Sequence, residues 1–222
     1  MADPTDPNDA RGGKIAALWI GIPSVLAVLF MAHHPTMRTQ GIAEAVASLN
    51  RMATINRVVH GGLIALLLAP LVGFAEMAAR LGWRRPAVRA GAIAYVAGAA
   101  AHVAAALVNG FVVTRLAGAY ADAAPEAIES LRPILRFCHE ANQVLAQTGV
   151  VAMSIGILAW SAVLVLRGGA ARIPGALGIA AGVLPAVALL AGVLTLDVRG
   201  MGLTVLAQAA WSLAVAAWLW RS

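Results

Sequence analysis

The chain has 222 residues, of which 61% are hydrophobic and 12% are charged, and its mean hydropathy is +0.82. Because soluble domains carry about 25% charged residues, this composition excludes an ordinary soluble fold and indicates that lipid surrounds most of the apolar surface. The net charge of +6 comes mainly from arginines scattered between apolar segments, without a dense basic tract, so the sequence predicts no nucleic-acid binding.

The first residues of the chain are polar, acidic and rich in proline, which predicts a disordered cytoplasmic tail over residues 1–13. One transmembrane domain is predicted over residues 14–222. Arg11 and Lys14 precede the first apolar run, as in a signal peptide, but no A-x-A cleavage motif follows it. We therefore expect this run to be a retained first helix.

Six apolar segments have lengths close to the roughly 20 residues that an α-helix needs to cross a bilayer. In chain order, these segments are 15–32, 58–79, 90–113, 142–166, 173–196 and 203–220. Pro23 and Pro70 lie inside two of them and predict bends. The predicted fold class is all-α, a polytopic membrane helix bundle.

Two further segments have amphipathic helical patterns and lead directly into the second and fourth spans. Their apolar residues are Ile42, Val46, Leu49 and Ala53 in one segment, and Ile128, Leu131 and Leu135 in the other. We expect the second and fourth helices to extend outward beyond the membrane and to pack on each other. Pro133 predicts a bend in the second extension.

The two extensions also resemble each other. Residues 43–49 are AEAVASL and residues 125–131 are PEAIESL, with four of the seven positions identical. The offset of 82 residues predicts a repeat of segments 14–83 and 90–168, followed by a hairpin over 173–221. Convergence of two amphipathic helices is an equally good explanation of so short a match.

The short loops that carry arginines predict the orientation in the membrane. Arginines crowd the second-to-third and fourth-to-fifth connections and flank both ends of the chain. The positive-inside rule therefore predicts that both termini are cytoplasmic. High alanine, arginine and glycine content with few lysines favours a bacterial inner membrane.

Five histidines from four predicted helices lie in the outer half of the membrane or at its periplasmic face. They are His33, His34, His60, His102 and His139. Imidazole binds copper, zinc and iron and is an axial ligand of haem b, so the sequence predicts a metal or haem site of redox or oxidase type. Polar residues expected in the same pocket are Asn56, Asn109, Glu140, Asn142 and Gln143.

Helical spacing indicates where these histidines point. His60 continues a stripe with Ala53 and Asn56, and His139 continues the stripe of Leu131 and Leu135, so both are expected to face the bundle. His102 lies among alanines, which let helices approach closely. Across a haem, His102 would pair with His60 or His139.

Two other functions remain open. Internal prolines and the repeat also suit a small transporter or channel-like protein. Alternatively, the histidines only join helices in an accessory or assembly subunit. The expected partners are the lipid bilayer and a second copy or partner subunit, and whether the chain catalyses a reaction is left open.

Overall fold

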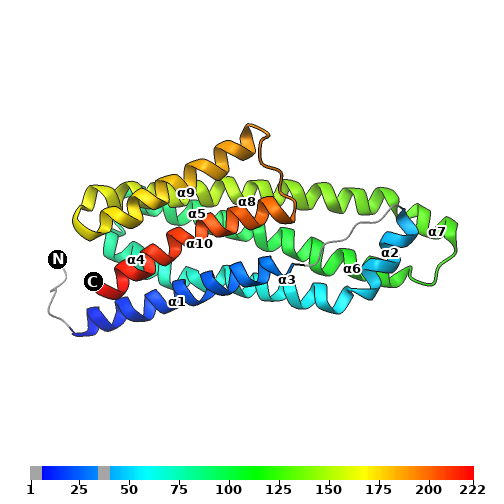
Figure 1. Cartoon of the computed structure of the whole chain (residues 1–222), viewed down its shortest axis with the longest axis horizontal. Helices are drawn as coiled ribbons and strands as arrows, with labels where there is room; N and C mark the ends of the chain where they lie inside the picture. The colour runs from blue at the N-terminus through cyan, green and yellow to red at the C-terminus, as the bar shows by residue number, and fades with distance from the viewer. Residues whose placement is uncertain (1–6, 35–40) are drawn as a thin grey trace.

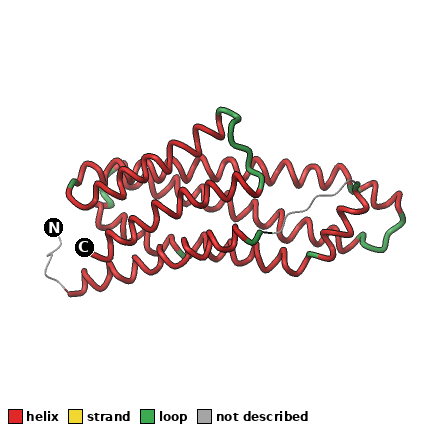
Figure 2. Tube along the Cα trace, in the orientation of Figure 1, coloured by secondary structure: helices red, strands yellow, loops and turns green. Residues whose placement is uncertain are grey.

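The computed structural model describes residues 7–34 and 41–222, and every regular element in them is helical (Figure 2). Six helical segments are long and apolar enough to cross a membrane, which is the number that the sequence predicts. They are Arg11–Ala32, Ala53–Gly82, Pro86–Ala119, Pro125–Arg167, Gly169–Leu190 and Val198–Arg221. The all-α bundle is therefore confirmed, and its insertion into a membrane stays a prediction.

Breaks and local changes of helix type divide these segments into shorter elements. In chain order, the α-helices are α1 Pro7–Ala32, α2 Ile42–Arg51, α3 Ala53–Leu68, α4 Pro70–Gly82, α5 Pro86–Leu107, α6 Val113–Ala119, α7 Pro125–Ser130, α8 Arg132–Arg167, α9 Arg172–Leu190 and α10 Val198–Arg221. A π-helix, η1 (Val108–Val112), joins α5 to α6, and a 3₁₀ turn, η2 (Gly169–Ala171), joins α8 to α9.

The long helices form an elongated bundle in which α1 packs beside α4 and α10, and α8 packs beside α5 and α9 (Figure 1). The beginning of α1, the end of α10 and the α4–α5 and α8–α9 connections share one end, which we call the terminal end. The short helices α2, α6 and α7 lie at the opposite end.

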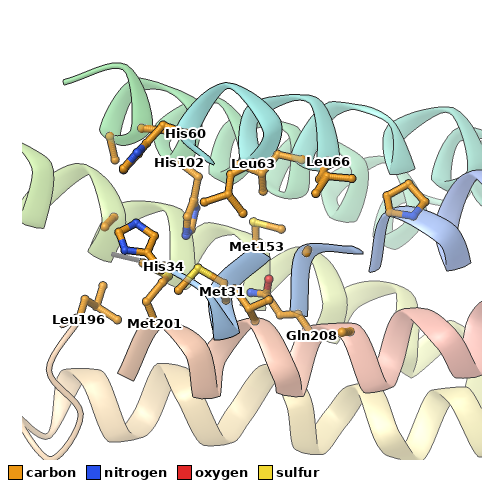
Figure 3. A pocket seen from close by; sticks show the side chains of 18 of the residues that line it. Met31, His34, His60, Leu63, Leu66, His102, Met153, Leu196, Met201 and Gln208 are labelled. Carbon is orange, nitrogen blue, oxygen red and sulfur yellow. The ribbon is translucent and has the colours of Figure 1, made fainter. Parts of the chain in front are cut away.

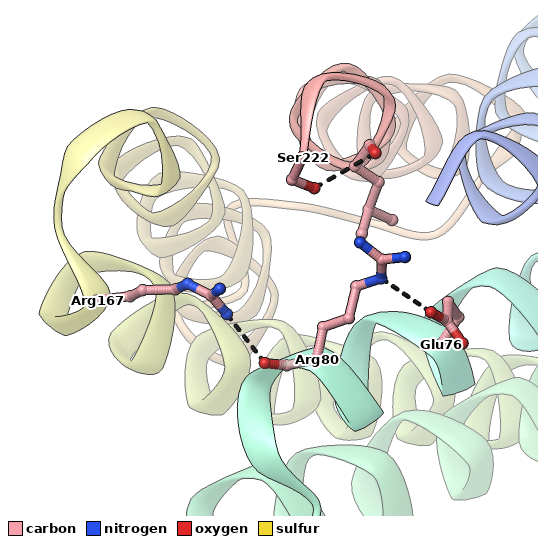
Figure 4. Close-up of polar contacts among 5 residues, drawn as sticks. Glu76, Arg80, Arg167 and Ser222 are labelled. Carbon is pink, nitrogen blue, oxygen red and sulfur yellow. Dashed lines mark hydrogen bonds and ion pairs between the residues drawn. The ribbon is translucent and has the colours of Figure 1, made fainter. Parts of the chain in front are cut away.

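Polar contacts join α4 to α8 at the terminal end (Figure 4). Arg80 Nε donates to Glu76 Oε1 at 2.8 Å, and Arg167 Nη1 donates to the carbonyl oxygen of Arg80 at 2.9 Å. The guanidinium of Arg167 also lies 5.5 Å from the centroid of the Trp218 ring. These contacts tie α4 to α8 and α8 to α10.

The first helix begins earlier than expected. It starts at Pro7, so residues 7–13 of the predicted disordered tail are helical, and residues 1–6 lie outside the described residues. Proline is compatible with the first turn of a helix, where its missing N–H has no intrahelical partner. A proline-rich start therefore does not by itself predict disorder.

The amphipathic extensions are present, but each is separated from its span by a break. α2 and α3 meet at Met52, and α7 and α8 meet at Leu131, two residues before Pro133. Val46, Leu49 and Leu131 belong to one apolar cluster, so the two extensions pack together as expected. The 82-residue repeat stays a prediction.

The fifth helix ends at Leu190, six residues before the predicted end. Gly192, with φ of 71°, donates its N–H to the carbonyl oxygen of Leu189 at 3.0 Å, and Val193 donates to Ala188 at 2.9 Å. This pair of bonds is a Schellman cap, which terminates a helix at a residue with positive φ. The chain then runs without regular structure to Asp197, whose carboxylate caps α10 by accepting from the N–H of Gly200 at 2.8 Å.

Candidate functional site

A cavity of about 200 Å³ lies among α1, α3, α5, α8 and α10. Its wall follows α5 and η1 from Tyr95 to Asn109 and α10 from Val198 to Ser212. Each stretch is about 21 Å long at 1.5 Å per residue. The cavity is therefore long and narrow and runs with the helices.

Packed aromatic rings close the cavity on the side of the terminal end. Tyr95 lines the cavity and contacts Phe74 and Trp160, with ring centroids 4.9 Å and 5.3 Å away. Trp211 stacks on Phe74 at 5.2 Å, and Trp160 donates its indole N–H to the carbonyl oxygen of Val88 at 3.1 Å. This cluster fills the bundle between the cavity and the terminal end.

The opposite end of the cavity is polar. His34, His60, Asn109, Asn142 and Asp197 line it there, and they come from α3, η1, α8 and the residues that follow α1 and α9. Leucines, alanines and methionines make up most of the remaining wall. The lining is thus richest in polar side chains at this end, and the polar side chains elsewhere in the wall include Ser24, Gln208 and Ser212.

His60 is held by hydrogen bonds on both ring nitrogens. Nδ1 donates to the carbonyl oxygen of Asn56 at 2.9 Å, since a carbonyl only accepts, and Nε2 accepts from the Asn109 amide at 3.1 Å. Gly110 lies against this imidazole, where a Cβ would overlap it. Asn109 and Gly110 are in the π-helix η1, and such bulges often occur at functional sites.

His102 is held on one side and open on the other. Its Nδ1 donates to the carbonyl oxygen of Gly98 at 3.1 Å, which fixes the neutral tautomer with the proton on Nδ1. Nε2 is then an acceptor, and no residue of the described chain hydrogen-bonds to it. Figure 3 shows His102 pointing into the cavity.

Gln208 of α10 enters the cavity from the opposite wall (Figure 3). Its Nε2 atom is buried and has no hydrogen-bond partner among the described residues. Buried amide donors without a partner are rare in folded proteins. The sequence analysis missed this residue, although a glutamine inside the apolar segment 203–220 is itself a signal.

Three methionines, Met31, Met153 and Met201, also line the cavity. They come from α1, α8 and α10 and surround the part of the cavity that His102 enters (Figure 3). Methionine commonly fills irregular gaps, and its thioether is also a soft metal ligand. The sequence analysis did not single them out, because three isolated methionines on three helices form no pattern.

The structure brings three of the five predicted histidines, His34, His60 and His102, to this cavity. His33 is exposed and hydrogen-bonds to the carbonyl oxygen of Leu29 at 2.9 Å. His34 meets His60 edge to face, with ring centroids 5.2 Å apart. Among the described residues, no group of three or more His, Cys, Asp or Glu side chains is arranged to hold a metal ion.

His139 and its neighbour Glu140 are exposed and do not line the cavity, contrary to the expected inward orientation of His139. The apolar stripe of α8 advances from Leu135 to Cys138 by three residues, and Cys138 is buried. The next inward position is therefore Asn142, which does line the cavity. His139 lies one residue off this stripe.

The remaining predicted pocket residues have structural partners. Asn56 is buried, and its carbonyl oxygen is the acceptor for His60. Gln143 donates to the carbonyl oxygen of Leu196 at 3.4 Å and so joins α8 to the α9–α10 connection. Neither lines the cavity, whereas Asn109 and Asn142 do.

Searches with the whole chain against protein-family models, curated proteins and solved structures give no match.

Proposed function

We propose that the chain is an integral membrane protein that binds an elongated amphipathic molecule in the cavity. The observation that carries this proposal is the long cavity itself, which is mostly apolar beside the aromatic cluster and richest in polar side chains at the other end. Small-molecule sites are typically concave and mostly apolar, with a few polar groups that orient the ligand. An apolar tail beside Tyr95 and a polar head towards the histidines match this lining.

The proposed orientation places the terminal end at the cytoplasmic face of a bacterial inner membrane. Nine cations at that end support it: Arg11, Lys14, Arg80, Arg84, Arg85, Arg89, Arg167, Arg172 and Arg221. α8 has 36 residues and is about 54 Å long, whereas the hydrocarbon core is about 30 Å thick. The first turns of α8, with α2, α6 and α7, would therefore project on the periplasmic side.

A bound lipid that survives purification tests the proposal. The protein is purified in detergent, and the molecules that it retains are extracted and quantified by mass spectrometry. Ala106→Phe places a ring in the cavity, whereas Ala100→Phe adds the same ring to the exposed face of α5. We expect about one retained amphiphile per wild-type or Ala100→Phe chain and a large loss in Ala106→Phe. Equal retention by all three proteins would contradict the proposal.

A second candidate is the binding of copper(I), favoured by the three thioethers around His102. Thioethers select soft ions such as copper(I) over zinc. A haem b is supported less well, because His139 is exposed and both nitrogens of His60 have partners. An iron or zinc site is also supported less well, because no three His, Cys, Asp or Glu side chains of the described residues are arranged to bind one ion.

Metal analysis after incubation with copper(I) under reducing conditions tests this candidate. We expect bound copper to fall in Met201→Leu and to persist in Met52→Leu, because Met52 lies outside the cavity. Zinc bound in place of copper, or no metal in any of the three proteins, would contradict copper binding and leave the amphiphile proposal intact.

A channel-like function receives less support from the cavity. The packed rings of Phe74, Tyr95, Trp160 and Trp211 occupy its inner end, so water or ions would have to displace buried aromatic side chains. Binding from the periplasmic side fits this closed inner end better than conduction across the bundle.

A further inference from the structure

We infer that the head group of the bound amphiphile is a hydroxyl, which donates a hydrogen bond to His102 Nε2 and accepts one from Gln208 Nε2. This inference rests on the proposed function and specifies the chemistry of its ligand. It comes from two polar side chains that line the cavity on opposite walls (Figure 3). His102 Nε2 has no partner among the described residues, and Gln208 Nε2 is buried without one.

The structure determines the role of His102. Because the Gly98 carbonyl can only accept, the proton of the neutral imidazole is on Nδ1, and Nε2 has a lone pair directed away from that bond. Gly149 packs against the ring so closely that a Cβ at this position would overlap Nδ1. The imidazole is thus positioned as an acceptor, and its complement is a ligand that donates.

Gln208 supplies the complementary role. Its amide nitrogen is buried and unpartnered in the described part of the chain, so it is a donor whose complement is a ligand that accepts. Gln208 lines the cavity with Met201 and Val205, which lie on the same face of α10 at helical spacing. Ser212, four residues further along α10, also lines the cavity, but its hydroxyl makes no hydrogen bond to this amide.

Both roles together select the head group. An ether, ester or ketone oxygen accepts but cannot donate to His102, and an ammonium donates but cannot accept from Gln208. Among the described residues that line the cavity there is no Lys or Arg, and Asp197 is the one acid, so no permanently charged cation there neutralises a phosphate or carboxylate. A hydroxyl is the smallest uncharged group that donates and accepts.

Three probes of equal chain length test the inference: 1-dodecanol, dodecyl methyl ether and dodecane. The first donates and accepts, the second only accepts, and the third does neither. Binding to the purified protein is measured as the rise in unfolding temperature over a range of probe concentrations in one detergent. The same titration of Ala106→Phe, whose cavity is filled, serves as the blank for effects of the probes on the micelle.

The alcohol should bind about fivefold more tightly than the ether, which is the effect of one net hydrogen bond. In His102→Phe, we expect this preference for alcohol over ether to disappear. In Gln208→Leu, both oxygen-containing probes should lose affinity relative to dodecane while the preference for the alcohol persists. A merely structural role of either residue would weaken all three probes together.

Two failures are distinguishable. If wild-type protein and Ala106→Phe respond alike to every probe, the cavity does not bind amphiphiles and the proposed function fails. If all three probes bind the wild-type cavity with equal affinity, the function stands and the hydroxyl inference is overturned. A preference for the alcohol that persists in His102→Phe would also overturn it.

Discussion

His102 and Gly149 are in contact across the α5–α8 interface so closely that a Cβ on Gly149 would overlap the imidazole. The same relationship joins His60 to Gly110 of the π-helix η1. Each of these two histidines thus has a glycine on a neighbouring element that makes room for its ring. The two imidazoles differ in their remaining contacts, and this difference separates a structural histidine from a ligand-binding one.

Replacing Gly149 with alanine should displace His102. The added methyl group overlaps Nδ1, so the ring must move and the bond to the Gly98 carbonyl must break or lengthen. We expect a loss of about 1–3 kcal/mol in the free energy of unfolding, measured in mixed micelles. The matched change Gly202→Ala on α10 meets no atom within 4 Å and should be neutral or stabilising by up to about 1 kcal/mol. Equal stability of the two variants would rule out the close packing of His102.

His60 should matter for stability, whereas His139 should not. His60→Leu removes the partner of the Asn109 amide and leaves the Asn56 carbonyl without its side-chain donor. A loss of about 1–3 kcal/mol is expected. His139→Leu changes an exposed residue and should alter the unfolding free energy by less than about 0.5 kcal/mol. If His139→Leu were the more destabilising variant, the orientation of α8 described above would be wrong.

Asp197 should contribute to stability as the N-cap of α10. Asp197→Ala removes the bond to the Gly200 N–H and should lower the unfolding free energy by about 1 kcal/mol. Asp197→Ser keeps a capping oxygen and should recover most of this loss. Thermal unfolding of both variants in the same detergent checks the result, and equal losses for alanine and serine would exclude the cap.

Cysteine labelling tests the proposed orientation. In a Cys138→Ala background, Arg84→Cys lies in the α4–α5 connection at the terminal end, and Asp122→Cys lies between α6 and α7 at the opposite end. A membrane-impermeant maleimide added to intact spheroplasts should label Asp122→Cys, and it should label Arg84→Cys only after lysis. The reverse pattern would invert the orientation and place the polar end of the cavity in the cytoplasm.

The sequence predicted the helices better than it predicted the cavity. Apolar length alone identifies six spans, because lipid requires about 20 apolar residues for each one. It could not foresee the Schellman cap at Gly192, since residues 191–196 are as apolar as the helix before them. Nor did Asn109 and Gly110 predict the π-helix, in which Gly110 lies against His60 of α3.

The histidine prediction shows where pattern analysis loses accuracy. His60 and His102 both line the cavity, but depth along the chain, on which their prediction rested, says nothing about the direction of a side chain. His139 was assigned to the inner face by extending a stripe by four residues, whereas the stripe advances by three to the buried Cys138. One residue rotates a side chain by about 100° around a helix, which is enough to move it from the core to the surface.

Photo-crosslinking tests the central claim most directly. A 1-dodecanol derivative with a diazirine in its alkyl chain is bound to the purified protein and irradiated, and the labelled peptides are sequenced. The account predicts labels on residues of the cavity wall, such as Leu66, Val205 and Ala209, and their loss in Ala106→Phe. Labels confined to exposed residues such as Val96 and Leu206, unchanged in Ala106→Phe, would show that the cavity does not take up the alcohol.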